Sequence, residues 1–155
     1  LPSIIFLVKV ILILRFTAIM IYLFSEEFEV RDYECDIQGI VNNANYQHYM
    51  EHARHCLIKS VGLDFKNLHD SGIDVVVSKI EIAYKKSLTS GDRFVCRTNV
   101  QKEGIRYVFY QDIYRLSDNA LCTKGRVETV AVINGKLGVS QVIEEALFNG
   151  KLLTE

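Results

Sequence analysis

The stretch ECDIQGIVNNANYQHYMEHAR, residues 34–54, places an acid and a glycine just before an expected helix. Asp36 lies in the loop, and the first N–H groups of a helix lack intrahelical partners and carry a partial positive charge. A carboxylate beside such donors has the groups that acyl transfer needs, because the acid can attack or activate water while a backbone N–H stabilises the oxyanion. Gly39 would let the loop turn tightly and approach a ligand. The alternative is that Asp36 only caps a turn, and the local sequence does not favour either interpretation.

The same stretch contains the side chains of a possible metal site: His48, Glu51, His52 and His55. At about 100° per residue, these four positions fall in one sector of the helix, opposite its apolar stripe. The order HYMEH also differs from the H-E-x-x-H pattern of zinc proteases. We therefore expect no catalytic metal and a face turned to solvent or to another subunit. Glu51 is expected to pair with Arg54 or His55 on the helix surface.

The helix that would position these groups is predicted from its periodicity. One stripe recurs at three- and four-residue spacing and consists of Tyr46, Tyr49, Met50, Ala53, Leu57 and Ser60. Asn42 or Asn43 is a suitable N-cap, and Gly62 is a suitable C-terminal stop. A further short helical turn is expected over residues 64–70.

The rest of the chain has the alternation and turn residues of strands. Strands are predicted over residues 22–32, 74–86, 94–102, 105–116 and 121–133. In the second of these, Val76, Ile80, Ile82 and Tyr84 are expected on one face. Asn134-Gly135 predicts a type I′ hairpin leading to residues 136–139, and a short helix is expected over 142–148. One long helix followed by hairpin-linked strands predicts an α+β fold, with the helix packed on an antiparallel sheet of about five strands.

Length and composition limit the class of protein. The 155 residues suit one domain, and the formal net charge of −1 gives no indication of nucleic-acid binding. The four cysteines are scattered and form no C-x-x-C pair, which favours reduced thiols in a cytoplasmic protein. Cys35 is interpreted as a small packed residue and not as a nucleophile.

The N-terminal segment is unusually apolar, from Ile4 to Phe24. It is long enough to span a bilayer, but Lys9 and Arg15 would each cost about 2.5 to 3.5 kcal/mol near the membrane centre. We expect residues 1–19 to be an extension outside the fold, with residues 20–155 as the single folded domain. The alternative is a genuine membrane anchor, and only in that case would the protein associate with a membrane.

The 34–54 stretch resembles the hotdog-fold acyl-CoA thioesterases of the 4-hydroxybenzoyl-CoA thioesterase family. Their pattern, D-x-D-x-x-G-[IV]-V-x-x-x-x-Y-x-x-[YF]-x-E-x-A-R, is matched in register by Asp36, Gly39, Ile40, Val41, Tyr46, Tyr49, Glu51, Ala53 and Arg54. The later SLTSGD is similar to the family's turn ending in Gly-Asp, and the likeness covers roughly residues 24–140. Glu34 replaces the first acid. Asn42 and Asn43 stand where members often have an aromatic residue followed by His or Pro.

The resemblance implies a hotdog fold and hydrolysis of acyl thioesters carried on CoA or acyl-carrier protein, without a cofactor. It implies Asp36 as the catalytic carboxylate, either nucleophile or general base, and the backbone N–H of Asn43 as the donor to the thioester carbonyl. Gly39 would shape the loop and Tyr46 would line the acyl pocket. It also implies homodimers or homotetramers with active sites between subunits.

A CoA substrate would need cations for its phosphates, and Lys85, Lys86, Lys102 and Arg106 lie near strand ends or hairpins. Lys86 and Arg106 are the two that we carry forward as substrate-binding candidates. A non-catalytic acyl-CoA-binding or regulatory module on the same fold is the main alternative function. A hotdog hydratase would need a histidine in the pocket, and the nearest, His48, is expected to point away from the core.

Overall fold

The computed structural model describes residues 21–149. The predicted N-terminal extension, residues 1–19, lies outside the described residues. Within this part of the chain, none of the helices combines the length and the apolar composition that crossing a membrane would require.

The sheet has six antiparallel strands with the order β1-β3-β4-β5-β2, and β6 adds to β5. The strands are β1 (Phe24–Glu29), β2 (Ile73–Tyr84), β3 (Arg93–Glu103), β4 (Arg106–Arg115), β5 (Leu121–Ile133) and β6 (Lys136–Gly138). Asn134 and Gly135 both have positive φ, +48° and +80°, as a type I′ turn requires. The predicted strands and this hairpin are confirmed.

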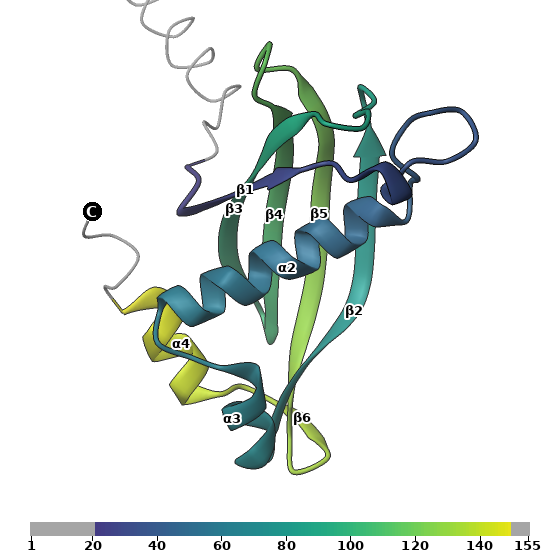
Figure 1. Ribbon diagram of the computed structural model, residues 1–155. Helices are drawn as coiled ribbons and strands as arrows, with labels where there is room; N and C mark the ends of the chain where they lie inside the picture. Colours follow the sequence, from purple (N-terminus) through teal and green to yellow (C-terminus); the bar gives the residue numbers. More distant parts are fainter. Residues whose placement is uncertain (1–20, 150–155) are drawn as a thin grey trace, which may run out of the picture.

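One long helix, α2 (Asn45–Ser60), lies across the concave face of this curved sheet (Figure 1). Two short helices, α3 (Phe65–Asp70) and α4 (Gln141–Phe148), lie beyond its C-terminal end. The 3₁₀-helix η1 (Asp32–Glu34) and a loop connect β1 to α2. This layering of one helix on one antiparallel sheet is the hotdog arrangement, so the predicted fold class is confirmed.

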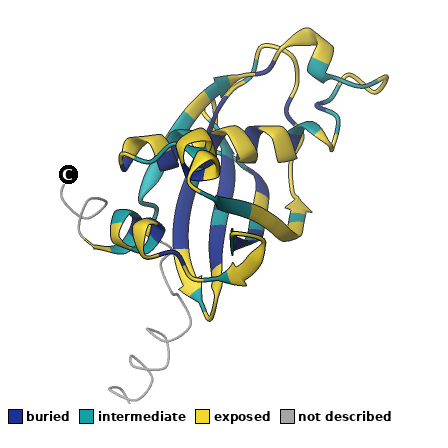
Figure 2. Cartoon of the chain, turned by 90° about the horizontal axis from the view of Figure 1, so that it is seen from below, coloured by how far each residue is buried: buried dark blue, intermediate teal, exposed yellow. Residues whose placement is uncertain are grey.

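The face of α2 that packs on the sheet is the predicted stripe. Tyr46, Tyr49, Met50, Ala53 and Leu57 are all buried, and only Ser60 of that stripe is exposed. Figure 2 shows buried residues along the central strands and exposed residues along the outer side of α2. Met50 packs directly on Gly125 of β5, where an added Cβ would lie 2.6 Å from Cε of Met50.

The predicted stop at Gly62 is also confirmed. Gly62 has φ +83°, and its N–H donates to the Lys59 carbonyl oxygen at 3.0 Å. The N–H of Leu63 donates to the Ile58 carbonyl oxygen at 3.1 Å, which completes a Schellman motif. The local sequence therefore ends the helix with its last carbonyl groups satisfied.

Two predictions from the sequence are wrong, one about β2 and one about α2. The strand β2 has an irregularity in its pairing with β5 between Val77 and Lys79, so a single alternating face does not run along it. Val75 and Ile82, one odd and one even position, both pack against the core, and Val76 does not share a face with Ile82. A β-bulge inserts an extra residue and so reverses the parity of the following side chains.

The second error concerns Arg54, which was expected on the helix surface but is only 7% exposed. Its Nη1 donates to Oε1 of Gln111 on β4 at 2.9 Å. The Nε2 of Gln111 donates in turn to the Met50 carbonyl oxygen at 2.9 Å. Burial lowers the pKa of Arg54. Arg54 follows Met50 by one helical turn, and its hydrogen bond to Gln111 holds the side chain against the sheet.

Candidate active site

The loop that carries Asp36 is closed by backbone hydrogen bonds. Cys35 and Val41 form an isolated β-bridge, and the Asp36 N–H donates to the Ile40 carbonyl oxygen at 2.9 Å. The Gly39 N–H donates to the Asp36 carbonyl oxygen at 3.0 Å. Gly39 has φ +76°, which an L side chain adopts only with strain, so a glycine is needed here to close the loop. Cys35 itself packs against the core, as expected.

The Asp36 carboxylate is partly held in place. Its Oδ1 accepts a hydrogen bond from the Gln38 N–H at 2.8 Å, which forms an Asx turn. No described residue donates to its Oδ2. The side chain is half-buried, so it is oriented by the loop while one oxygen remains free to act on a ligand. Asp36 therefore does cap a turn, as the alternative interpretation expected, but it uses only one of its two carboxylate oxygens to do so.

The start of α2 lies next to this loop. The prediction of Asn42 or Asn43 as N-cap is wrong, because the helix begins at Asn45 and Ala44 is its N-cap. Asn42 instead holds the preceding turn: its Oδ1 accepts from the Ala44 N–H at 3.0 Å, and its carbonyl oxygen accepts from the Asn45 N–H at 2.9 Å. Ala44 already has helical backbone angles, so this turn runs directly into the helix.

Asn43 immediately precedes these two residues, Ala44 and Asn45, whose N–H groups are bonded. Within residues 21–149, its own N–H forms no hydrogen bond. Its carbonyl oxygen accepts a hydrogen bond from the Tyr84 hydroxyl at 3.1 Å. The hydrogen bond to its carbonyl oxygen therefore holds Asn43 in place, and its N–H remains an unused donor close to the positive end of the helix.

A cavity of about 280 Å³ brings most of the predicted site residues together. It is lined by Asp36, Gln38, Ile40, Val41, Asn43, Tyr46, Tyr84, Lys85, Lys86 and Ser87. Asp36, Asn43, Tyr46 and Lys86 were singled out from the sequence for this purpose. Gly39 is not part of the lining and contributes through the backbone of the loop.

The inner wall of the cavity is aromatic. The rings of Tyr46 and Tyr84 meet edge to face, with centroids 5.4 Å apart. The Tyr46 hydroxyl oxygen accepts a hydrogen bond from the Leu88 N–H at 3.3 Å. Burial raises the pKa of Tyr46, so its phenol is neutral near physiological pH. The cavity therefore combines one carboxylate, one free backbone donor and two tyrosine rings.

Arg106 lies elsewhere in the structure. It pairs with Val130 on β5, whereas Tyr84 pairs with Thr123, seven residues away and about 23 Å along the strand. Its Nε lies 3.1 Å from a carboxylate oxygen of Glu128.

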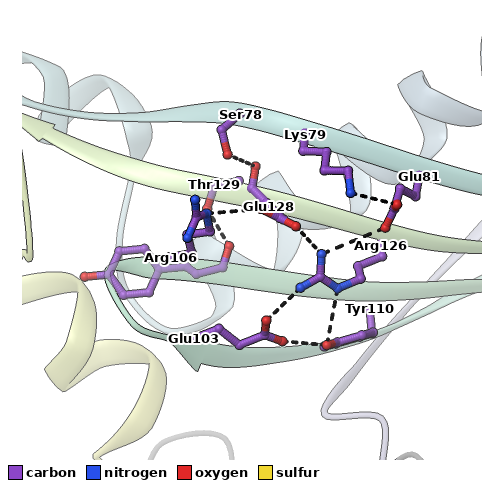
Figure 3. Close-up of polar contacts among 10 residues, drawn as sticks. Ser78, Lys79, Glu81, Glu103, Arg106, Tyr110, Arg126, Glu128 and Thr129 are labelled. Atoms are coloured by element: carbon purple, nitrogen blue, oxygen red, sulfur yellow. Dashed lines mark hydrogen bonds and ion pairs between the residues drawn. The ribbon is translucent and has the colours of Figure 1, made fainter.

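Glu128 belongs to a charged network that includes Arg126, Glu81 and Glu103 (Figure 3). Gly125 and Val127 face the core, so the alternating Arg126 and Glu128 point to the opposite face of the sheet. Lys102 also lies outside the cavity and forms an ion pair with Glu144. Of the four candidate cations, the structure brings only Lys85 and Lys86 to the cavity.

Tyr84 and Ser87 are lining residues that the sequence argument missed. Tyr84 ends β2 immediately before the two lysines, and an aromatic residue at that position was the available signal. Ser87 is held by a residue from another strand, because Nη1 of Arg115 donates to the Ser87 carbonyl oxygen at 3.0 Å. Arg115 is itself paired with Asp118 at 2.7 Å.

The expected solvent face of α2 is confirmed, since His48, Glu51, His52 and His55 are all exposed. The expected pairing of Glu51 with Arg54 is not found. Glu51 instead lies 4.0 Å from Nδ1 of His48.

Comparison with known proteins identifies the family of this chain. Residues 30–147 match the model of the Thioesterase-like superfamily. A putative esterase of Aquifex aeolicus is 32% identical over 108 residues, which are 70% of this chain and 84% of that protein. The chloroplastic acyl-acyl carrier protein thioesterase ATL2 of Arabidopsis thaliana is 37% identical over 58% of this chain. The chain spans about half the length of that relative, 48%.

A solved structure shows the same fold. The DHNA-CoA thioesterase of Staphylococcus aureus superposes with a TM-score of 0.71 at 26% identity, over 84% of this chain and 85% of that one. The likeness covers both the sheet and the long helix that carries the candidate site.

Proposed function

Because this chain belongs to the thioesterase-like superfamily, we propose that it hydrolyses acyl thioesters in the cavity between the Asp36 loop, the start of α2 and the end of β2. The observation that carries the proposal is the position of two groups: the Asp36 carboxylate and the Asn43 N–H line the same cavity, and each has an unused hydrogen-bonding site within the described residues. A binding module would have no need of a carboxylate there.

The proposed reaction uses Asp36 in one of two ways. As a general base, it takes a proton from water while the water oxygen attacks the thioester carbonyl carbon. The resulting oxyanion is stabilised by the Asn43 N–H at the positive end of α2. Collapse of the intermediate breaks the carbon–sulfur bond, and the leaving thiolate takes the proton from Asp36. As a nucleophile, Asp36 would instead attack the carbonyl carbon and expel the thiolate as the carbon–sulfur bond breaks, which forms an acyl anhydride. Water would then hydrolyse the anhydride, releasing the acid and restoring the Asp36 carboxylate.

The proposed substrate is an acyl group on CoA or on acyl-carrier protein. Tyr46 and Tyr84 would contact the acyl part, since they form the aromatic wall. Lys85 and Lys86 would meet the phosphates, because both are exposed at the same cavity. The name of the Arabidopsis relative specifies acyl-acyl carrier protein, and the name of the Staphylococcus protein specifies a CoA ester. The proposed substrates therefore include both carriers. No cofactor takes part in the proposed reaction.

We also propose that the protein forms homodimers or homotetramers in the cytoplasm. Among residues 21–149, the strand β2 pairs with β5 alone and is an edge of the sheet. It exposes Val76 and Val77, at 43% and 46%, and Ile80 beside them. An apolar edge of this kind is a liability in a monomer, and a second copy would cover it. All four cysteines are free, which fits a reducing compartment.

The test is release of free thiol from short, long and aromatic acyl-CoAs and from acyl-carrier protein. We expect turnover by the wild type and loss of about 10²-fold or more in Asp36→Asn, with folding intact. Asp32→Asn is the matched control, because Asp32 is an acid of the same loop region and bonds to Ser90 away from the cavity. Unchanged turnover in Asp36→Asn would refute the catalytic assignment. Binding of acyl-CoA without any turnover would favour the acyl-CoA-binding module instead.

A further inference from the structure

A second group of polar side chains converges between β1 and the outer side of α2. The ligand atoms of Glu26, His52 and Cys56 all lie within 4.8 Å of one another. His52 and Cys56 are four residues apart on α2 and so occupy the same face, with Nε2 and Sγ separated by 3.4 Å. Glu26 comes from β1, more than twenty residues earlier, and faces them from the sheet. Sequence analysis did not identify this group, because Glu26 is distant in the chain from His52 and Cys56.

We propose that Glu26, His52 and Cys56 form a binding site for a divalent zinc ion. One thiolate, one imidazole and one carboxylate are the three kinds of ligand that Zn²⁺ uses in proteins, at about 2.0 to 2.3 Å from the metal. Donor atoms that surround a common metal at those distances lie roughly 3 to 4 Å from each other, so the present spacing needs only side-chain adjustment. A water molecule would complete four-coordinate geometry.

The charges of the group favour a cation over a reactive cysteine. The Glu26 carboxylate lies beside the Cys56 sulfur, and a bare thiolate there would place two negative charges together. A divalent cation neutralises both. Binding follows a simple balance: Zn²⁺ replaces the thiol proton of Cys56, that proton goes to solvent, and the site with thiolate, carboxylate and neutral imidazole has no net charge.

The surroundings would hold the ligands in position. The His52 ring meets Phe28 of β1 edge to face, with centroids 5.7 Å apart. Glu26 and Cys56 are both half-buried, so the carboxylate and the thiol are not on freely moving surface side chains. The site therefore has one ligand on the sheet and two on the helix, and a metal bound there would tie the edge strand β1 to α2.

This site is separate from the proposed catalytic cavity. His52 lies nine residues beyond Asn43, or about 13 Å along the helix axis. None of the three ligands lines the cavity that contains Asp36. The zinc ion would therefore act on the stability of the β1–α2 contact and not on the thioester itself.

The experiment measures zinc directly, in the full chain, and does not depend on thioester hydrolysis. Purified protein is loaded with equimolar Zn²⁺, dialysed and analysed for metal, and its affinity is measured by competition with a chromophoric chelator. We expect one zinc ion per chain in the wild type, with binding weakened at least roughly tenfold in His52→Ala and in Cys56→Ser. Cobalt substitution should give a sulfur-to-metal charge-transfer band that Cys56→Ser lacks.

The matched controls are His55→Ala and Cys35→Ser, which remove a histidine of the same helix and another partly exposed free cysteine. Both should bind zinc like the wild type, and zinc should raise the Tm of the wild type and both controls only. His52 is exposed, so His52→Ala gives a folded variant even if Cys56→Ser does not. Absence of zinc from the loaded wild type, or equal affinity in His52→Ala, would overturn the site.

Discussion

The hydroxyl of Tyr84, the last residue of β2, donates a hydrogen bond of 3.1 Å to the backbone carbonyl oxygen of Asn43, just before α2. Their sequence separation is 41 residues. The contact fixes the peptide whose neighbouring N–H we propose as the oxyanion donor. It also joins the end of the edge strand to the start of the central helix, so the two sides of the cavity are held together by one side chain.

Removal of this hydroxyl should weaken catalysis with little effect on folding. In Tyr84→Phe we expect kcat to fall about three- to tenfold, because one neutral hydrogen bond contributes about 1 kcal/mol and here it orients the donor. Steady-state kinetics would measure the change. Tyr33→Phe is the matched control, since Tyr33 is exposed and its hydroxyl bonds only to Arg31 among the described residues. Equal kcat values for Tyr84→Phe and wild type would contradict this role.

Lys86 and Arg106, the two substrate-binding candidates from the sequence, should affect substrate binding differently. Lys86→Ala is expected to raise KM for an acyl-CoA about three- to tenfold with little change in kcat, because Lys86 lines the cavity and would meet a phosphate. High salt should reduce the difference from wild type, since the contact is exposed and screened. Arg106→Ala should leave KM unchanged, because Arg106 pairs with Glu128 on the other face. A similar rise of KM in both variants would contradict the placement.

The buried pair of Arg54 and Gln111 should be important for stability. Gln111→Leu removes the hydrogen-bond partner of a nearly buried guanidinium and a donor to the Met50 carbonyl. We expect the free energy of unfolding to fall by about 2 to 4 kcal/mol, since the charge is left buried without its partner. Urea denaturation would measure it. Gln101→Leu, at an exposed position of β3, should change stability by less than about 0.5 kcal/mol, and comparable losses in both would contradict the prediction.

The ion pair between Arg115 and Asp118 should make the stability of the fold depend on pH in the acid range. The hydrogen bond from Arg115 lowers the pKa of Asp118 from its ordinary value of 3.8 to about 2. A carboxyl with a lower pKa in the folded state stabilises the fold above its unfolded pKa, and this contribution is lost as the pH falls through the folded value. Asp118→Asn should therefore have a lower Tm than wild type at neutral pH, with the difference shrinking between about pH 4 and pH 2. Thermal denaturation by circular dichroism measures it. A Tm difference that stays constant with pH would contradict the assignment.

The fold could be predicted because its signals are local. A type I′ turn requires positive φ at two positions, and Asn134 and Gly135 adopt it readily. Gly62 likewise adopts the left-handed conformation that ends α2. The helical stripe from Tyr46 to Leu57 follows from spacing alone. Each of these is a preference of neighbouring residues, so a single sequence is sufficient to detect it. The short helices α3 and α4 were found in the same way, from apolar residues bounded by turn residues.

The misplaced N-cap of α2 was a local error, but the other errors came from partners that are remote in the chain. Nothing near Arg54 predicts that Gln111 lies beneath it, and nothing in residues 74–86 shows which residue of β2 forms the bulge against β5. The same applies to Glu26, which meets His52 and Cys56 only when β1 packs against α2. Register and side-chain pairing between strands and helix are set by packing, and packing involves the whole core at once.

The sequence by itself determined the fold class, the order of the elements, the loop with Asp36 and Gly39, and the aromatic residue Tyr46 after it, because each depends on residues within a few positions of one another. Only the tertiary structure decided that Tyr84, Lys85 and Lys86 complete that cavity while Arg106 does not. The physical reason is the geometry of the sheet: side chains at opposite ends of paired strands are separated by tens of ångströms, however similar their charges look in the sequence.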